Sequence, residues 1–430
     1  MGKNYSKKIM AAILTFALLI SCAGIKTTAF AASDDCIGIL SGRIADVKSN
    51  EYTKNTTAAS KLKNKAKVLF IGNSMTFYNN TPYLFQEMAG KNTVVNYLTC
   101  GSQCLYNHGE WIHKVLESNG IYKNFEKNCT TKDMDILFKK GSTGDGYYKN
   151  PSKSVLKRWY NWYASALFQN YTDEKNTKKL TPISYDYVIL QDCLGNLSDT
   201  ANFNSCIKKS KASLSRDFYK DTWKGGLCRV IYELRNNGAA HGRTKYVINA
   251  LYSPLKENGK NGEKVDTLLE AERMQNKIDN QAVKLKDTLA NGFKVPGDKT
   301  FALGGSDVKV AYTGDVMLSY LHDTKGKNAE WKASSLSTVI QSDRKHPKLA
   351  ASVMQAATIY RTIYGKQPSN QSFSNVPRAY NICKNYEKES EEDNKKDIPD
   401  ENGYTFVKNN IATLYKYVQK YGTTTKAAWK

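Results

Sequence analysis

KVLFIGNSMTFYNN, residues 67–80, carries the clearest structural signal in the chain. Residues 68–71 form a continuous apolar run, which is typical of a strand buried on both faces of an α/β sheet. The run stops at Gly72, and a helix-like pattern begins at Pro82. Because α/β proteins often place a nucleophile or a ligand-binding loop where such a strand ends, Ser74 is a candidate functional residue. The alternative is an ordinary turn serine.

Other short segments rich in β-branched and aromatic residues also read as strands: 93–98, 186–192, 246–252 and 308–312. Apolar residues recur at helical spacing in the regions 267–285 and 349–363. Strands that alternate with helices indicate a parallel sheet covered on both faces. We therefore predict an α/β fold, a flavodoxin-like three-layer α/β/α sandwich with a parallel sheet of about five strands, a long insertion and a C-terminal helical tail.

The chain of 430 residues is long enough to bury one large core, and one elaborated domain fits it better than two equal ones. The aromatic residues of a predicted helix at 154–168 are interpreted as core rather than as a sugar-binding platform. The last helix is expected to dock on its own domain, with a partner as the alternative. The predicted organisation is a signal peptide at 1–31, a lead-in at 32–63, an α/β domain at 64–366 with an insertion at 109–184, a charged linker at 367–404 and a C-terminal helix at 405–430.

The N-terminus has the pattern of a secretory signal. Lysines precede an apolar stretch at residues 9–20, which is too short to span a bilayer, and Ala29-Phe30-Ala31 is a small-x-small cleavage site. The competing interpretation is a lipoprotein processing box that ends at Cys22, which would leave the protein tethered to the membrane. Both interpretations predict a location outside the cytosol. No later apolar stretch is long enough for a transmembrane helix, so none is predicted.

The chain is strongly basic, with a formal net charge of +23. Removal of residues 1–31 takes away four lysines and no acids, which lowers this charge to +19. A basic exported protein is attracted to polyanions, so an anionic cell-wall polymer is a candidate partner, with simple solubility as the alternative. The lysines are dispersed and no aromatic-basic motif appears, so nucleic acid is not predicted as a partner.

Nine cysteines are present, and eight of them follow the signal segment. An even number in an exported chain permits disulfides, although the sequence does not define the pairing. The sequence has no CxxC pair and no His/Cys array, so no structural zinc site and no other metal or organic cofactor is predicted. Cys100 and Cys104 flank Gly101, where they form either a disulfide or two buried thiols.

Polar candidates follow several of the predicted strands. Ser74 follows the first strand, Gly101 the second and Gln191 ends the third, while Asp343 and His346 precede the final helix of the domain. The carboxyl ends of parallel strands meet at one edge of a sheet, so these groups are expected to gather there. Such a set contains a nucleophile, a base, an orienting carboxylate and oxyanion donors.

The motifs together resemble the SGNH (GDSL-like) hydrolase family. The resemblance rests on GNS after an apolar strand, a glycine after the second strand, VILQ at the third and DxxH before the last helix. The spacing in GSQCLYNH, residues 101–108, is similar to that of an uncharacterised extracellular bacterial subgroup of this family. The resemblance implies that Ser74 is the nucleophile, His346 the general base and Asp343 its orienting partner. It also implies an oxyanion hole made by the Ser74 and Gly101 amides and the Gln191 side chain.

Elementary chemistry supports these roles. A serine hydroxyl becomes a good nucleophile when a base removes its proton, and neutral imidazole suits that step near neutral pH. The chain also departs from the family pattern, because Asn73 replaces the usual aspartate and Gln191 replaces the usual asparagine. Asn73 and His108 are further candidates for substrate binding. The alternatives are a structural histidine at 108, a backbone-satisfying Gln191, and a plain polar turn at Asp343 and His346.

The expected function is that of a secreted serine esterase that hydrolyses small acyl esters through an acyl-enzyme. The resemblance and the exported location favour O-acetyl groups on carbohydrate as the substrate class, with lipid esters, thioesters and acyl transfer to a sugar as alternatives. A different class of function remains open. The chain could be a non-catalytic extracellular binding protein on an SGNH scaffold, attached to anionic wall or host polymers by its positive charge.

Overall fold

The computed structural model describes residues 65–90, 93–99, 104–130, 133, 153–172, 176–192, 223–256, 263–294, 300–336, 338–341, 344–369, 401–423 and 426–430. The predicted signal peptide and lead-in lie outside these residues, as does most of the charged linker. Four residues on which the predictions depend, Cys22, Cys100, Gly101 and Asp343, also lie outside them. Among the helices within these ranges, none combines the length and the apolar character needed to cross a bilayer.

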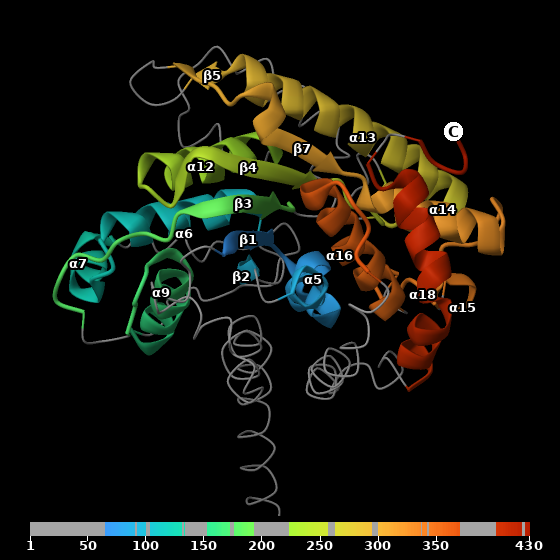
Figure 1. Ribbon diagram of the computed structural model, residues 1–430, viewed down its shortest axis with the longest axis horizontal. Coiled ribbons are helices and arrows are strands. Elements are labelled where there is room, and N and C mark those ends of the chain that lie inside the picture. The colour runs from blue at the N-terminus through green and yellow to red at the C-terminus, as the bar shows by residue number, and fades with distance from the viewer. Residues whose placement is uncertain are drawn as a thin grey trace, which may run out of the picture.

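A parallel sheet of five strands forms the centre of the fold, in the order β2-β1-β3-β4-β7 (Figure 1). This order confirms the predicted flavodoxin-like architecture. β1 lies between β2 and β3, and its residues 68–71 are fully buried, which explains their continuous apolar character. The strands are β1 (Ala66–Gly72), β2 (Thr93–Thr99), β3 (Tyr185–Leu190), β4 (Ala240–Asn249) and β7 (Val308–Ala311). The sequence did not indicate the small hairpin of β5 (Phe293–Lys294) and β6 (Thr300–Phe301).

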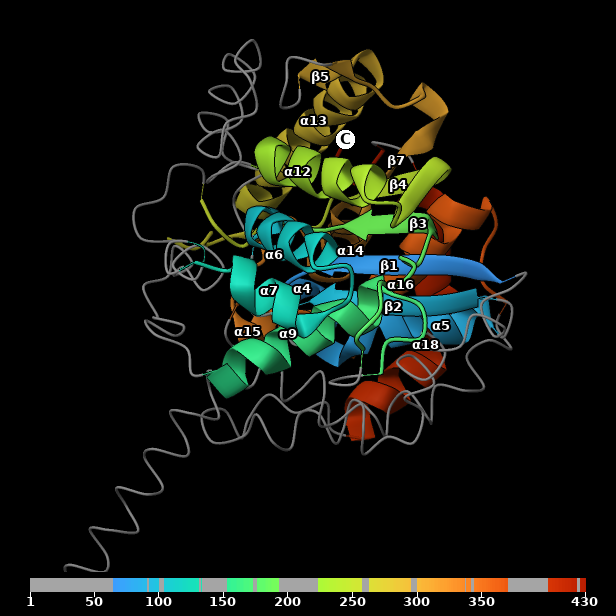
Figure 2. The same ribbon diagram turned by 90° about the vertical axis from the view of Figure 1, so that its left-hand side faces the viewer.

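Helices cover both faces of the sheet. One layer contains α6 (Leu105–Glu117), α9 (Lys153–Leu167) and α12 (Trp223–Asn236), with α7 (Tyr122–Asn128) at its border (Figure 2). The opposite layer contains α5 (Thr81–Ala89), α16 (Leu349–Tyr364) and α18 (Glu401–Tyr421) (Figure 1). α13 (Leu268–Asn291) and α14 (Thr313–Lys325) pack together beside β7. The helical side of the three-layer prediction is therefore also confirmed.

The described part of the predicted insertion packs into the main core. Trp159 and Tyr163 of α9 are fully buried, and both rings stack on Trp111 of α6 with centroid distances of 5.3 and 5.2 Å. Ring pairs of this kind add to the free energy gained by burial. The aromatic residues of this helix are therefore core residues, as expected from their helical spacing.

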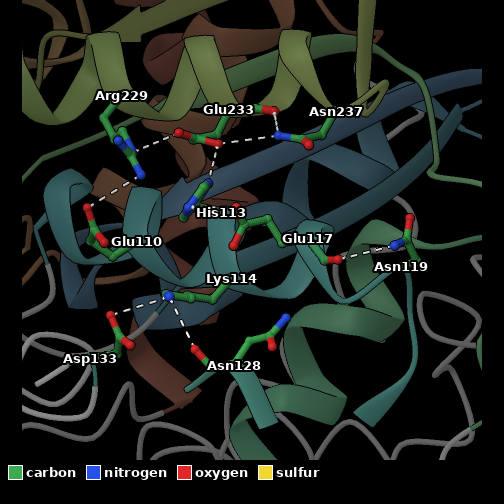
Figure 3. A network of polar contacts seen from close by, with 10 residues as sticks. All are labelled: Glu110, His113, Lys114, Glu117, Asn119, Asn128, Asp133, Arg229, Glu233 and Asn237. Atoms are coloured by element: carbon green, nitrogen blue, oxygen red, sulfur yellow. Dashed lines mark hydrogen bonds and ion pairs between the residues drawn. The ribbon is translucent and has the colours of Figure 1, made fainter. Parts of the chain in front are cut away.

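α6 and α12 approach each other closely and carry a charged network at their interface (Figure 3). The Arg229 guanidinium contacts Glu233 at 2.9 Å and Glu110 at 3.6 Å. His113 lies between Glu233, at 2.8 Å, and Glu117, at 3.2 Å. Glu110 and Glu233 are buried, so their carboxylates require these partners. The network fixes the position of α6, the helix that follows the predicted oxyanion segment.

The last helix docks on its own domain, as expected. α18 packs against α16 and α14, and it buries Val407, Leu414 and Val418. It begins at Glu401, within the predicted linker and a few residues before the predicted start. Beyond it, the Lys430 ammonium reaches Asp279 of α13 at 2.7 Å and Asp315 of α14 at 3.2 Å. Apolar contacts and the contacts of Lys430 with two buried aspartates therefore both hold the C-terminal segment in place.

Candidate functional site

Ser74 begins a short helix immediately after β1. This helix, α4 (Ser74–Phe77), was not expected from the sequence, whereas the helix predicted from Pro82 is α5. The Asn73 side-chain oxygen accepts a hydrogen bond from the Met75 amide at 3.1 Å, which satisfies a donor of the first turn. Ser74 is 7% exposed, and its hydroxyl forms no hydrogen bond within the part of the chain that the structure describes. Asn73 thus has a structural role beside its predicted role in substrate binding.

The end of β3 supports this turn from one side. The Gln191 amide donates to Ile71 O at 3.0 Å, which continues the pairing of β1 and β3 beyond the strands. The Gln191 side-chain oxygen accepts from the Asn73 amide at 3.1 Å and from the Thr76 hydroxyl at 2.8 Å. Its NH2 group donates to the Asp192 carbonyl. Gln191 therefore lies at the predicted edge and holds the turn, and its role as an oxyanion donor stays a prediction.

Gly72 lies in close contact with two of these side chains. A Cβ atom at this position would lie 2.7 Å from Thr76 Oγ1 and 2.8 Å from Gln191 Oε1. Real Cβ atoms essentially never come this close to another heavy atom. A side chain at position 72 would therefore force the Thr76 and Gln191 side chains to shift.

His108 lies beneath the turn. Its side chain is fully buried, and its Nε2 and Nδ1 atoms hydrogen-bond to Gly72 O at 2.8 Å and to the Tyr163 hydroxyl at 2.7 Å. Desolvation lowers the pKa of His108 to about 4, with an opposing contribution from the bond to Gly72. This geometry favours a structural histidine over a substrate-binding one.

The segment that carries His346 is attached to the same edge of the sheet. Asn79, five residues after Ser74, donates through Nδ2 to Pro347 O at 2.8 Å and to Ser352 Oγ at 2.9 Å. Asn79 has φ 53°, in the left-handed region that asparagine tolerates better than most residues. Because Pro347 directly follows His346, this contact brings two parts of the chain together that are 268 residues apart.

Three further contacts hold the His346 segment. Gln341 N donates to His346 O at 2.9 Å, the Tyr252 hydroxyl donates to Lys345 O at 2.7 Å, and Trp331 Nε1 donates to Arg344 O at 3.0 Å. His346 is 9% exposed. Buried side chains from β4 onward therefore position the predicted base.

The structure brings the predicted nucleophile and base to one region, but they form no hydrogen bond with each other. The Ser74 hydroxyl does not bond to either ring nitrogen of His346. Catalytic hydrogen bonds are often long in unliganded enzymes, so this separation does not exclude the pair. Because Asp343 and Gly101 lie outside the described residues, their predicted roles stay predictions.

The cysteine prediction is resolved at one position. Cys104 is a free thiol that donates to Asn107 Oδ1 at 2.7 Å, so of the two alternatives for Cys100 and Cys104 the structure favours the thiol at Cys104. The alternative of an unpaired thiol is correct for Cys104, although its side chain is only partly buried. Within the described ranges, no group of three His, Cys, Asp or Glu side chains is arranged to hold a metal ion.

Sequence reasoning missed four residues that support the site: Asn79, Tyr163, Tyr252 and Trp331. The Asn79-Asn80 pair offered a signal, because asparagine is enriched at positive φ and both residues have it. The other three residues act through side-chain hydrogen bonds to other segments of the chain. Such bonds produce no recognisable pattern in the local sequence. Tested against protein-family models, curated proteins and solved structures, the chain matches none.

Proposed function

We propose that this protein is a secreted serine esterase that hydrolyses small acyl esters. The observation that carries the proposal is the hydrogen bond from Asn79 to Pro347 O, which holds the turn after Ser74 against the residue after His346. The site lies where β1 and β3 are neighbours and their helices leave to opposite faces of the sheet. Ligands of open α/β sheets bind at such switch points.

In this mechanism the chain supplies every group. His346 removes the proton of the Ser74 hydroxyl as the oxygen attacks the ester carbonyl, and it then protonates the leaving alcohol. Asp343 accepts from the imidazole and holds its tautomer. The Ser74 and Gly101 amides stabilise the oxyanion, and Gln191 adds a donor after it releases the Asp192 carbonyl. Water then attacks the acyl-enzyme with His346 as base, which releases the acid.

The favoured substrate is an O-acetylated carbohydrate. This choice rests on the resemblance to SGNH hydrolases and on the secretory signal at residues 1–31. After removal of the signal peptide, the net charge of +19 would hold the protein near an anionic wall polymer and so near such a substrate. The alternative location is the membrane surface, through a lipid on Cys22.

The main alternative is a non-catalytic extracellular binding protein on the same scaffold. Two observations favour it. The Ser74 hydroxyl is not hydrogen-bonded to His346. The Gln191 side chain already accepts from the Asn73 amide and donates to the Asp192 carbonyl. Its positive charge would then serve attachment alone.

A short-chain p-nitrophenyl ester assay separates the two functions. We expect turnover by the wild type and its loss, by a factor of roughly 10⁴ or more, in Ser74→Ala and His346→Ala, because removal of a nucleophile or base disables the whole triad. Ser306→Ala is the matched control, because Ser306 is exposed and precedes β7, at the opposite edge of the sheet. Wild-type turnover no faster than that of folded Ser74→Ala would favour the binding protein.

A further inference from the structure

One peptide group of the nucleophile turn is held at both of its polar atoms. The Gly72 carbonyl accepts from His108 Nε2 at 2.8 Å, and the Asn73 amide, which belongs to the same peptide, donates to Gln191 Oε1 at 3.1 Å. The His108 side chain comes from α6, which covers one face of the sheet, and the Gln191 side chain comes from the residue after β3. This peptide lies one residue before the peptide that joins Asn73 to Ser74. A rotation of the Gly72–Asn73 peptide would therefore move the Ser74 amide and side chain.

The contacts of His108 define its tautomer. Because Gly72 O is only an acceptor, His108 Nε2 must carry a hydrogen. In the neutral ring Nδ1 is then an acceptor, and the Tyr163 hydroxyl donates to it at 2.7 Å. Complete burial, which lowers the pKa of His108 to about 4, keeps the ring neutral at physiological pH.

Tyr163 is itself fixed by the core. It comes from α9, and its ring stacks on Trp111 at 5.2 Å and meets Trp162 edge-on at 4.9 Å. Trp111 belongs to α6 and lies three residues after His108, so the same helix carries the imidazole and the ring that holds its partner. The α9 segment thereby reaches the nucleophile turn through two hydrogen bonds in series, from Tyr163 to His108 and from His108 to Gly72.

We propose that His108, oriented by Tyr163, is a positioning residue that sets the geometry of Ser74 and its amide by clamping the Gly72–Asn73 peptide. The proposal rests on the proposed role of Ser74 as nucleophile. His108 touches no substrate and exchanges no proton during the reaction. Its effect is on the orientation of the groups that do, and an error of about 1 Å in such groups costs roughly 10²-fold in rate.

The test compares His108→Leu, His108→Gln and Tyr163→Phe in the ester assay. His108→Leu removes the donor to Gly72 and should lower kcat roughly 10²-fold with little change in KM, because substrate contacts remain. His108→Gln keeps an N–H near the position of Nε2 and should recover most of this loss. Tyr163→Phe should lower kcat by a smaller factor, because the ring keeps its donor but loses the group that imposes its tautomer.

His322→Leu is the control for a purely structural role. His322 is another hydrogen-bonded histidine, 2.7 Å from the buried Glu272, between α13 and α14. Its loss should lower the melting temperature without lowering kcat. If His108→Leu lowers kcat no more than His322→Leu at a matched loss of melting temperature, the positioning role is overturned. Should His108→Leu fail to fold, His108→Gln and Tyr163→Phe provide the test. A wild-type kcat in both of these folded variants would overturn the positioning role.

A second readout works without enzymatic turnover. The chain has only five histidines, so ¹⁵N imidazole spectra can resolve His108, which should stay in the neutral Nε2–H form between pH 5 and 9. In His108→Leu the amide resonances of Asn73 and Ser74 should shift, while they should stay in place in His322→Leu. If the wild type lacks esterase activity, the proposed function fails, yet these shifts still support the clamp. Unchanged amide resonances, or a proton on Nδ1 at neutral pH, would overturn it.

Discussion

His108 beside the Ser74 turn and Asp315 at the start of α14 are both completely buried, yet burial changes their charge in opposite ways. Desolvation lowers the pKa of His108 to about 4, so this base loses its proton. Desolvation, with the nearby negative charge of Asp279, raises the pKa of Asp315 to about 9, so this acid keeps its proton. In both cases the low-dielectric interior favours the neutral form.

The surroundings of the two groups differ as well. Within the described residues His108 hydrogen-bonds to two neutral partners, Gly72 and Tyr163, so the Ser74 turn is held without a charge. Asp315 shares the Lys430 ammonium with Asp279, which is also buried. Neutral hydrogen bonds keep the site geometry constant over a wide pH range, whereas the C-terminal attachment depends on charge. We therefore expect substitutions and pH to act on the two regions differently.

The largest expected effect is at the charged region. Lys430→Met removes the cation from a buried carboxylate pair and should lower the free energy of unfolding by about 3–5 kcal/mol at pH 7. Urea unfolding measures this change. Lys332→Met is the control, because the Lys332 pair with Glu330 is exposed and should contribute less than about 1 kcal/mol. Equal effects of the two substitutions would show that the buried cluster does not hold the C-terminal segment.

A second prediction concerns the rise from pH 6.5 to 9. The folded pKa of Asp315, about 9, exceeds its usual value of 3.8, so its contribution to stability is present below pH 4 and is lost as the pH rises through 9. Between pH 6.5 and 9 the free energy of unfolding should therefore fall, by at most about 1.4 kcal/mol per pH unit. Asp315→Asn, which resembles the protonated acid, should flatten this slope. A variant with the wild-type slope between pH 6.5 and 9 would contradict the assignment.

The smallest effect is expected at acidic pH, from the neutral region. The folded pKa of His108, about 4, lies below its usual 6.5, so its contribution is present above pH 6.5 and is lost as the pH falls through 4. This window is narrower than that of Asp315. His108→Gln has no titrating ring, so its free energy of unfolding should fall less than that of the wild type between pH 6.5 and 4. Urea unfolding of both proteins at a series of pH values measures this difference. The same dependence of the free energy of unfolding on pH in both proteins would mean that the ring is not neutral in the folded protein.

Much of the fold was predictable because its signals are local. The five strands of the main sheet were found from short apolar runs, and the core role of Trp159 and Tyr163 followed from helical spacing. The start of α4 was missed because a single cap at Asn73 creates it, without an apolar pattern. The β5–β6 hairpin was missed because its two-residue strands carry too little pattern to detect.

The candidate site was predictable in part. Ser74 and Gln191 lie at the expected sheet edge, and the His346 segment is joined to it through Asn79. The sequence did not reveal that the Gln191 side chain holds the turn, or that His108 is completely buried. These properties depend on which atoms lie within about 3 Å of one another across distant segments, a distance at which hydrogen bonds form.

The sequence by itself determined the alternation of strands and helices, the apolar core and the order of the candidate groups, since periodicity and turn chemistry act over a few residues. Only the tertiary structure decided which partner each buried polar group received: Gly72 and Tyr163 for His108, and Lys430 for Asp279 and Asp315. The physical reason is that a buried polar or charged group is stable only with a partner, and in a folded chain that partner comes from whichever segment packs against it.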